Sequence, residues 1–244
     1  AYTTIPSTLV TNAQKELSDY VNTCSVNENN FRLTMQYWQE TTYVDESNYN
    51  FTNRNVSNNV WTDNYVNVLK NLDQAKKTIE SYNPTATELS TWPTTKKNQL
   101  AMVDIMKVFT YQVLVDIYGD IPYSQSLNYE AYPLPKYDKG SDIYADLIVR
   151  LKQDIASIDT SGAGFGSSDI FYYDGGDSDL TKWVKFGNSV LLKLGMGIAD
   201  SNPSLAQSTV NTAIAGGVIS SSSESCLFRY LSSAPNFNPL YGEL

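Results

Sequence analysis

The chain has 244 residues, 41% of them hydrophobic, which allows one large domain or two small ones with a sizeable core. Its formal charge of -9 and the absence of any Lys/Arg cluster argue against nucleic acids and anionic membrane surfaces as partners. Histidine is absent, which excludes Ser-His-Asp and Cys-His catalysis in their usual forms and His-ligated zinc.

Three further features bear on the cellular context. No hydrophobic run approaches roughly 18 residues, so we expect no membrane-spanning helix. The chain shows no signal peptide and begins with Ala rather than Met, which favours a processed or trimmed N-terminus. Cys24 and Cys226 lie far apart in sequence, and two alternatives stay open: one disulfide or two separate buried thiols.

Tyrosine dominates the aromatic residues, with 18 Tyr against 8 Phe and 4 Trp. Tyr and Trp combine a flat apolar face with a polar edge. A surface that is acidic and rich in Tyr and Asn suits neutral polar ligands such as sugars or peptides. The alternative is simply a Tyr-rich soluble protein.

The first helical pattern covers residues 8–21, with Thr8 or Ser7 as the expected N-cap. Residues 22–30 are polar and rich in Asn, which predicts a loop. Residues 31–40 fit either a helix or an extended segment that packs through its apolar side chains.

A stretch that is both aromatic and polar follows, TTYVDESNYNFTNRNVSNN. Aromatic faces beside amides, carboxylates and one guanidinium offer stacking and hydrogen bonding to hydroxyl-rich ligands. The alternative is a solvated loop anchored by its aromatic residues. Asp45 and Glu46 are poor candidates for a catalytic pair, because adjacent residues rarely face one cleft. The residues that we select as candidate ligand-binding residues are Trp38, Tyr43, Tyr49, Asn53 and Arg54.

A long amphipathic helix is predicted from Trp61 to Glu80, with Thr62 or Asn59 as its cap and Asn83–Pro84 after its end. Residues 85–95 are expected to form a loop. It contains Trp92–Pro93, and packing under the loop is the favoured role of this Trp.

The most apolar helix of the chain is predicted from Lys96 to Tyr118, and its composition places it at the centre of the core. Gly119 ends it through a left-handed conformation, and Pro122 prevents its continuation. Residues 119–140 are expected to wrap over the surface as an irregular segment. The apolar residues of the central helix are Met102, Val103, Ile105, Met106, Phe109, Tyr111, Val113, Leu114, Val115, Ile117 and Tyr118.

The next helix is expected to start at Ser141 or Asp142 and to run to Ile158. Residues 159–181 then form a loop rich in Gly, Ser and Asp. Its aspartates Asp174, Asp177 and Asp179 give a weak signal for calcium, because the spacing lacks the terminal Glu of an EF-hand. Capping of the following helix by Asp177, Ser178 or Asp179 is the favoured alternative, and no other cofactor or metal is expected.

A buried helix is predicted from Trp183 to Asp200, and its glycines Gly187, Gly195 and Gly197 would permit close approach of a neighbouring helix. A shorter helix over residues 204–215 is expected to end at Gly216–Gly217, and the tail shows no hydrophobic period. The sum is a mainly α fold of stacked helix pairs, similar to a tetratricopeptide array, with long irregular loops and minor or no β structure. The consensus of that repeat is absent. We treat residues 1–244 as a single helical domain.

Four stretches resemble the SusD/RagB family, and their order and spacing agree across most of the chain. They lie at residues 36–49, 61–72, 116–124 and 174–189, and the ending at residues 238–244 is also similar. The third stretch contains the sequence YGDIPYS, in which the central helix ends.

The resemblance implies a helical, tetratricopeptide-like surface lipoprotein of Bacteroidetes that is anchored to the outer membrane by a lipidated N-terminal cysteine. Such proteins bind oligosaccharides, or in some cases peptides, and deliver them to a SusC-like TonB-dependent transporter. They are not enzymes. The lipidation cysteine is missing here, and family members are considerably longer, so the chain resembles an N-terminal portion, and whether its ligand site is complete stays open.

We therefore expect non-catalytic oligosaccharide binding, and two alternatives are retained. One is a helical-toroid glycoside hydrolase or lyase, which requires two opposed carboxylates. Its candidates Glu40, Asp45, Asp120 and Asp177 are scattered along the chain. The other is a peptide-binding or purely scaffolding subunit of the same uptake complex.

Overall fold

The structure is a computed structural model that describes residues 5–234 and 236–243. Its architecture is mainly α, as the sequence predicts, with one pair of very short strands among the described residues. The α-helices are α1 (Pro6–Asn22), α2 (Phe31–Thr34), α3 (Val56–Thr62), α4 (Lys70–Ser81), α5 (Trp92–Tyr118), α6 (Gly140–Ser157), α7 (Leu180–Gly197), α8 (Pro203–Gly216) and α9 (Pro239–Glu243). The remaining elements are the 3-10 helices η1 (Glu46–Asn48), η3 (Gly166–Ser168) and η4 (Ser222–Glu224), the π-helical η2 (Asp63–Leu69), and the strands β1 (Ile121–Pro122) and β2 (Tyr137–Asp138).

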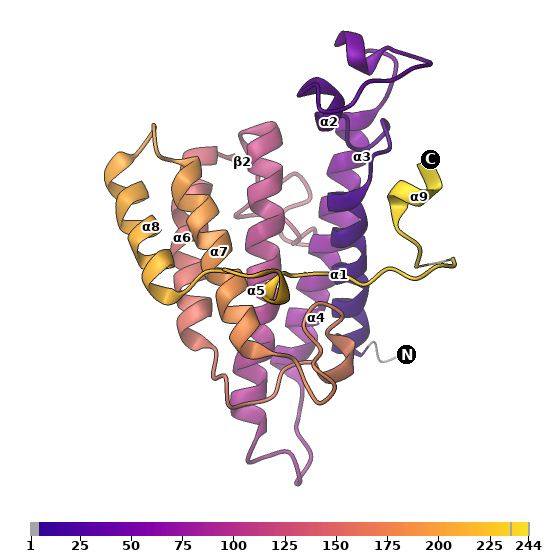
Figure 1. Cartoon of the computed structure of the whole chain (residues 1–244). Helices are drawn as coiled ribbons and strands as arrows, with labels where there is room; N and C mark the ends of the chain where they lie inside the picture. Colours follow the sequence, from indigo (N-terminus) through magenta and orange to yellow (C-terminus); the bar gives the residue numbers. More distant parts are fainter. Residues whose placement is uncertain (1–4, 235, 244) are drawn as a thin grey trace.

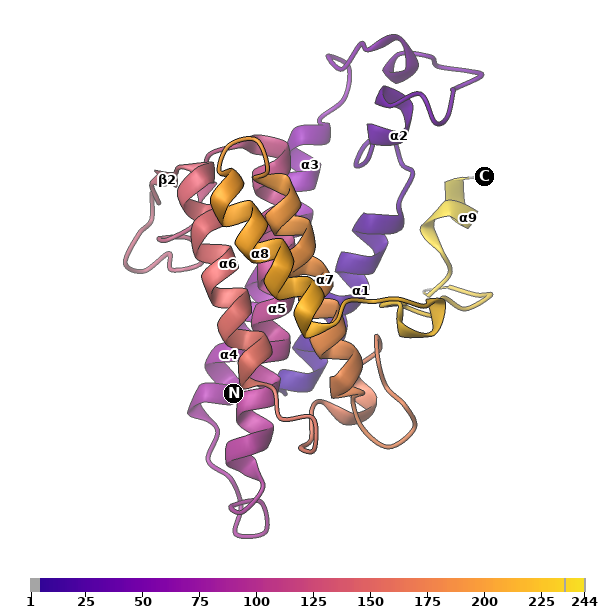
Figure 2. The same cartoon turned by 60° about the vertical axis from the view of Figure 1, so that its left-hand side comes forward.

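The long helices stack side by side in an order that follows the sequence (Figures 1 and 2). The α1 helix packs against η2 and α4, and each following helix packs against the next one up to α8. Because α3, η2 and α4 are continuous, residues 56–81 act as a single rod that includes a wide π-helical turn. The expected stack of helix pairs is therefore confirmed.

The central helix α5 is the most buried of the long helices, since it contacts η2, α4, α6 and α7. Its side chains at Met102, Ile105, Met106 and Leu114 are completely buried. Burial of one such side chain contributes about 1.5–3 kcal/mol. Gly119 ends the helix with φ of +74°, as expected.

Four of the apolar residues expected in the core of α5 are only half-buried: Phe109, Val113, Ile117 and Tyr118. The helix also starts earlier than expected, at Trp92, because proline is tolerated in the first turn of a helix. The predicted loop position of Trp92 is thus wrong, and its ring packs on Tyr82 with a centroid distance of 4.7 Å.

The predicted N-caps are wrong for three of the long helices, namely α1, the helical rod and α6. The α1 helix begins at Pro6, so Ser7 and Thr8 lie inside its first turn. The helical rod begins at Val56, which places Asn59 and Thr62 inside it as well.

For α6, the helix begins at Gly140 rather than after Ser141 or Asp142. A residue from another element supplies the missing acceptor: Asp120 accepts a hydrogen bond of 2.9 Å from the backbone N–H of Gly140. By contrast, Asp179 caps α7, as predicted, by accepting from Lys182 N at 3.1 Å.

Residues 119–140 cross the surface between α5 and α6, and their two ends are joined. The strands β1 and β2 pair in antiparallel fashion, with Ile121 opposite Asp138. The Tyr65 hydroxyl donates to the carbonyl oxygen of Pro122 at 2.6 Å, which ties this segment to η2. The YGDIPYS sequence therefore forms the junction between α5, η2 and α6.

The α7 helix approaches its neighbours closely at its glycines, as expected. A Cβ atom at Gly187 would lie 2.8 Å from Ile155 Cγ1, and one at Gly195 would lie 3.0 Å from Val210 Cγ2. Any larger residue at these positions would separate α7 from α6 or α8.

An ion network connects α4, α5 and α6, and we call it the inter-helix ion network. Arg150 donates from Nε and Nη2 to both carboxylate oxygens of Asp104, and from Nη1 to the Tyr123 hydroxyl. Lys107, which is buried on α5, forms an ion pair of 3.0 Å with Asp73 on α4. The network is thus a set of charged pairs inside the stack, where each charge depends on its partner.

Asp154 lies next to this network on α6, and burial together with the negative charge of Asp104 raises its pKa to about 9. One of its carboxylate oxygens is buried and has no hydrogen-bond partner within the described part of the chain. Both effects favour the protonated form of Asp154 over the charged form.

Within residues 5–234 and 236–243, none of the helices combines the length and apolar character that a bilayer crossing requires. Both cysteines are thiols, so the disulfide alternative for Cys24 and Cys226 is not realised. Of the stretch at residues 238–244, residue 244 lies outside the described part of the chain.

Candidate ligand-binding site

The residues between α1 and α3 extend beyond the helix stack, at the upper end in Figures 1 and 2. We call residues 31–54 the aromatic segment. It contains α2 and η1 and is irregular elsewhere, so the open choice between a helix and an extended segment for residues 31–40 resolves into one helical turn followed by turns. Its buried side chains are Leu33 and Glu46, while most of its aromatic residues are exposed.

Three residues of the aromatic segment have a left-handed backbone: Gln36, Tyr43 and Tyr49, with φ of 58°, 58° and 60°. Non-glycine residues adopt this conformation at a cost of order 1–3 kcal/mol each, and such positions cluster at ligand sites. The surrounding contacts must therefore hold the segment in this shape.

A cavity of about 620 Å³ opens in this segment, and we call it the aromatic cavity. Its floor and sides combine the rings of Tyr37 and Trp38 with amide and hydroxyl groups. The lining residues are Leu33, Gln36, Tyr37, Trp38, Gln39, Val44, Ser47 and Asn48. A flat ring surrounded by amides that both donate and accept hydrogen bonds is suited to a hydroxyl-rich ligand.

Trp38 is the predicted site residue that lines this cavity, and 44% of its surface is exposed. Its ring is held in place by Arg32, whose guanidinium lies 5.3 Å from the ring centroid. Arg32 is itself fixed by a hydrogen bond of 2.6 Å from Nη1 to the carbonyl oxygen of Thr23. The indole is thus oriented before any ligand binds.

Tyr43 and Tyr49 flank the cavity without lining it. Tyr43 is 81% exposed and directly precedes Val44, which is a lining residue. The Tyr49 hydroxyl donates to the carbonyl oxygen of Thr34 at 2.9 Å and accepts from Gln36 Nε2 at 3.2 Å. Tyr49 therefore positions the amide of a lining residue.

Asn53 and Arg54 hold the base of the segment. Asn53 Nδ2 donates to Asp45 at 3.0 Å, and Arg54 forms an ion pair with Glu46, which is only 1% exposed. The structure does not bring either of these two predicted site residues to the aromatic cavity. Their contacts indicate that they order the segment.

Four polar lining residues were not predicted from the sequence: Gln36, Gln39, Ser47 and Asn48. The signal that would have identified the first two is the run QYWQ, in which an amide flanks the aromatic pair on each side. Ser47 and Asn48 come to the cavity through η1, and no sequence period predicts that turn.

The carboxylates that a hydrolase would require are each used locally. Glu40 accepts from the backbone N–H of Ser47 at 3.1 Å, and Asp120 accepts from Gly140 in another part of the molecule. Asp177 accepts from the backbone N–H of Gly164 in the 159–181 loop at 3.0 Å. These positions do not bring two carboxylates to the aromatic cavity.

The weak calcium signal at Asp174, Asp177 and Asp179 finds no support in the geometry. Asp174 accepts from the backbone N–H of Gly176 at 2.9 Å, and Asp179 caps α7. In the part of the chain that the structure describes, no group of three or more acidic or cysteine side chains is arranged to hold a metal ion.

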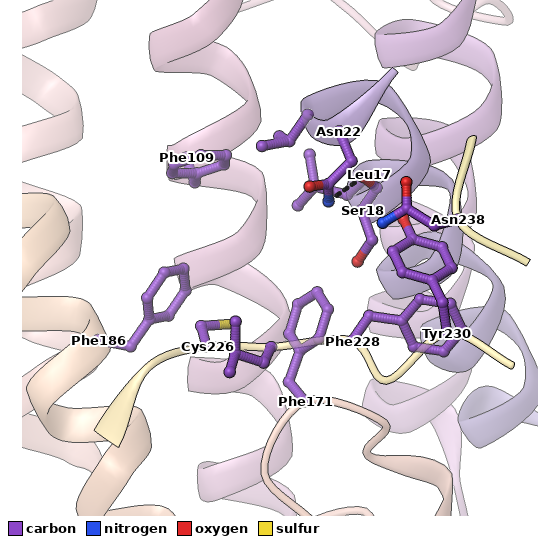
Figure 3. Close-up of a pocket in the computed structure, with 12 residues that line it drawn as sticks. Leu17, Ser18, Asn22, Phe109, Phe171, Phe186, Cys226, Phe228, Tyr230 and Asn238 are labelled. Atoms are coloured by element: carbon purple, nitrogen blue, oxygen red, sulfur yellow. Dashed lines mark hydrogen bonds between the residues drawn. The ribbon is translucent and has the colours of Figure 1, made fainter. Parts of the chain in front are cut away.

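A second cavity, of about 380 Å³, lies between α1, α5, α7 and the tail (Figure 3). Aromatic rings of Phe109, Phe171, Phe186 and Phe228 surround it, and the polar groups of Ser18 and other residues lie at one side. We call it the apolar cavity. It offers few hydrogen-bonding groups, which makes it less suited to a sugar than the aromatic cavity.

Comparison with known proteins identifies similar sequences and structures. The SusD-like family model described as "Starch-binding associating with outer membrane" matches residues 1–243. A solved chitin-binding protein is 29% identical, with a TM-score of 0.74, and the match covers 92% of this chain and 46% of that chain. No match is found among curated proteins.

Two other solved structures share the fold. A SusD/RagB family protein from Bacteroides thetaiotaomicron is 20% identical, with a TM-score of 0.75, over 98% of this chain and 48% of that chain. A SusD-like protein from Bacteroidetes is 22% identical, with a TM-score of 0.71, over 93% of this chain and 40% of that one. The chain thus spans less than half the length of the solved structures that it matches here.

Proposed function

Because the chain belongs to the SusD-like family, whose model matches it over residues 1–243, we propose that it is a non-catalytic subunit that binds oligosaccharides at the cell surface. The family is one of glycan-binding proteins associated with the outer membrane. The 29% identical relative is a chitin-binding protein, which supports the choice of a saccharide over a peptide.

The aromatic cavity is the main structural support for this proposal. The half-exposed indole of Trp38 gives a stacking surface for a sugar ring, and the amides of Gln36 and Gln39 supply hydrogen bonds to hydroxyl groups. Tyr43 extends the aromatic surface beyond the cavity, as a longer saccharide requires.

Calorimetric titration of a panel of oligosaccharides, including chitin and starch fragments, tests the proposal. We expect at least one member to bind, and Trp38→Ala to weaken its binding by tenfold or more, which corresponds to about 1.4 kcal/mol. Tyr129→Ala is the matched control, because Tyr129 is 78% exposed on the 119–140 segment, outside the aromatic cavity. Heats equal to buffer for every saccharide would reject the proposal, as would unchanged binding by the Trp38 variant.

We also propose that the subunit delivers its ligand to a SusC-like TonB-dependent transporter and is held at the outer membrane by a lipid. This part rests on the family alone. Co-purification of the protein with such a transporter from outer-membrane extracts tests it. Fractionation away from that membrane would contradict it.

A further inference from the structure

A third cavity, of about 810 Å³, lies between the 159–181 loop and the tail, and we call it the arginine cavity. Polar and charged groups line it together with aromatic ones. We propose that it is a second saccharide site, specific for sugars that carry a carboxylate. The residues that the argument uses are Tyr173, Asp174, Lys182, Ser222, Ser223 and Arg229.

One wall of the arginine cavity is fixed by a fully buried carboxylate, Asp169. It accepts hydrogen bonds from Gln14 Nε2 of α1 at 2.9 Å and from Trp183 Nε1 of α7 at 2.6 Å. It also accepts from the backbone N–H groups of Phe171 and Tyr172 at 3.1 and 3.3 Å. The loop is thus attached to two helices at the position where the cavity begins.

The opposite wall is the tail, and it is tied to the same loop. The Tyr172 hydroxyl donates to the carbonyl oxygen of Glu224 at 3.0 Å. The Glu224 carboxylate forms an ion pair with Lys185 of α7 and accepts from the backbone N–H of Ser220 at 2.9 Å. Because both walls are fixed, the cavity exists without a ligand, as is usual for small-molecule sites.

Arg229 differs from the other arginines of the chain. Arg32 stacks on an indole, Arg54 pairs with Glu46, and Arg150 pairs with Asp104. Arg229 lines the arginine cavity and forms no hydrogen bond or ion pair with residues 5–234 or 236–243. Its guanidinium is therefore the one that is available to a ligand.

Tyr173 gives the cavity an unoccupied aromatic surface. It is 46% exposed, and its ring packs on no other ring in the described part of the chain. Its backbone is held by an antiparallel bridge to Ser178, across a turn in which Gly175 has φ of +106°. The ring is thus presented on a fixed hairpin, as a stacking surface for a pyranose.

These groups together favour an acidic sugar. The planar guanidinium of Arg229 matches a carboxylate with two parallel hydrogen bonds. Lys182 lines the same cavity and adds positive charge, although Asp179 lies 3.4 Å from its ammonium group. Asp174 also lines it. Its carboxylate accepts hydrogen bonds from the backbone N–H groups of Gly176 and Asp177, and these lower its pKa, so it accepts from sugar hydroxyls rather than binding the acid group.

The arginine cavity and the aromatic cavity are separate. The 159–181 loop lies at the lower end of the helix stack in both views, whereas the aromatic segment extends from the upper end (Figures 1 and 2). A saccharide at one cavity therefore leaves the other free, and the two proposals can fail independently.

Calorimetric titration of the full 244-residue chain with trigalacturonate, as the free acid and as its methyl ester, tests the proposal. The two probes share one sugar backbone and differ in the charge of their carboxyl groups. We expect the acid to bind at least tenfold more tightly than the ester, and Arg229→Ala and Tyr173→Ala to weaken binding of the acid by tenfold or more.

One matched variant is expected to leave binding of the acid unchanged. Lys139→Ala removes the same charge from an exposed position at the start of α6. The proposal is overturned by buffer heats for the acid, by equal affinity for acid and ester, or by unchanged binding in Arg229→Ala. Tighter binding of a sulfated trisaccharide than of the acid would also overturn it, because the site would then recognise sulfate rather than carboxylate.

Discussion

The inter-helix ion network and the aromatic segment use the same kind of pair in different surroundings. In the network, Arg150 binds Asp104 between long helices that bury apolar residues on several sides. In the segment, Arg54 binds Glu46 beneath residues that are mostly exposed. The first pair links elements that already pack, whereas the second is one of the few buried contacts of its region.

We expect the surroundings of an arginine–carboxylate pair, rather than the pair itself, to decide what its loss affects. A charge left alone inside the stack affects the whole fold, because the helices unfold together. A charge left alone in the aromatic segment affects a region with few buried side chains, which can open by itself. Three substitutions test this difference.

The largest effect is expected for Arg150→Ala. It leaves the Asp104 carboxylate without its partner in the stack, which should lower the free energy of unfolding by about 3–5 kcal/mol. Urea denaturation at neutral pH measures the change. Arg229→Ala is the matched control, and we expect a change within about 0.5 kcal/mol, because this exposed arginine has no ion pair with the described residues. Equal losses in the two variants would contradict the assigned role of the network.

An intermediate effect is expected for Asp154→Asn, and it depends on pH. Burial raises the pKa of Asp154 to about 9, above its ordinary value near 3.8, so the folded protein keeps a proton that the unfolded chain loses. The free energy of unfolding therefore falls as the pH rises between these two values. The Asn variant lacks this proton, so its free energy of unfolding should rise relative to that of the wild type by up to about 1.4 kcal/mol for each pH unit between pH 5 and pH 8.

Denaturation of both proteins at several pH values checks this prediction. Asp142→Asn is the control, because Asp142 is exposed at the start of the same helix. Parallel pH profiles for wild type and Asp154→Asn would show that this carboxyl group does not retain its proton.

The smallest effect on global stability is expected for Arg54→Ala, at about 1 kcal/mol or less. The aromatic segment should open locally instead, because Glu46 loses its ion pair. The packing of α1 against the helical rod is not affected by this change. Hydrogen exchange should become faster at the amides of residues 44–50 and stay unchanged in α5. Faster exchange throughout α5 would mean that the segment unfolds together with the stack.

Most of the fold could be predicted from the sequence, because helical periodicity is a local property. The central helix was found through the spacing of Met102, Ile105 and Met106, and its end through Gly119. The helix starts were less accurate. For α6 the acceptor is Asp120, which lies 20 residues before Gly140, so no local pattern identifies it.

The candidate site was predicted less completely, for the same reason. Trp38 could be selected because a Trp in a polar, aromatic stretch has a recognisable chemistry. The role of Arg54 could not be read from its residue type, since it depends on which carboxylate the turns of the segment bring to it. The arginine cavity was not predicted either, because its walls are joined only by tertiary contacts such as that between Tyr172 and Glu224.

The pairing of β1 with β2 affects how freely the length of the segment between α5 and α6 can vary. They join the two ends of the segment between α5 and α6, so the residues between them form a closed loop at the surface. The closure entropy of a flexible loop grows slowly, by about 0.6 kcal/mol for each doubling of its length. Insertions at the tip near Tyr129, which is exposed, should therefore leave the helix stack intact. The length of this loop can therefore change at a small cost in stability.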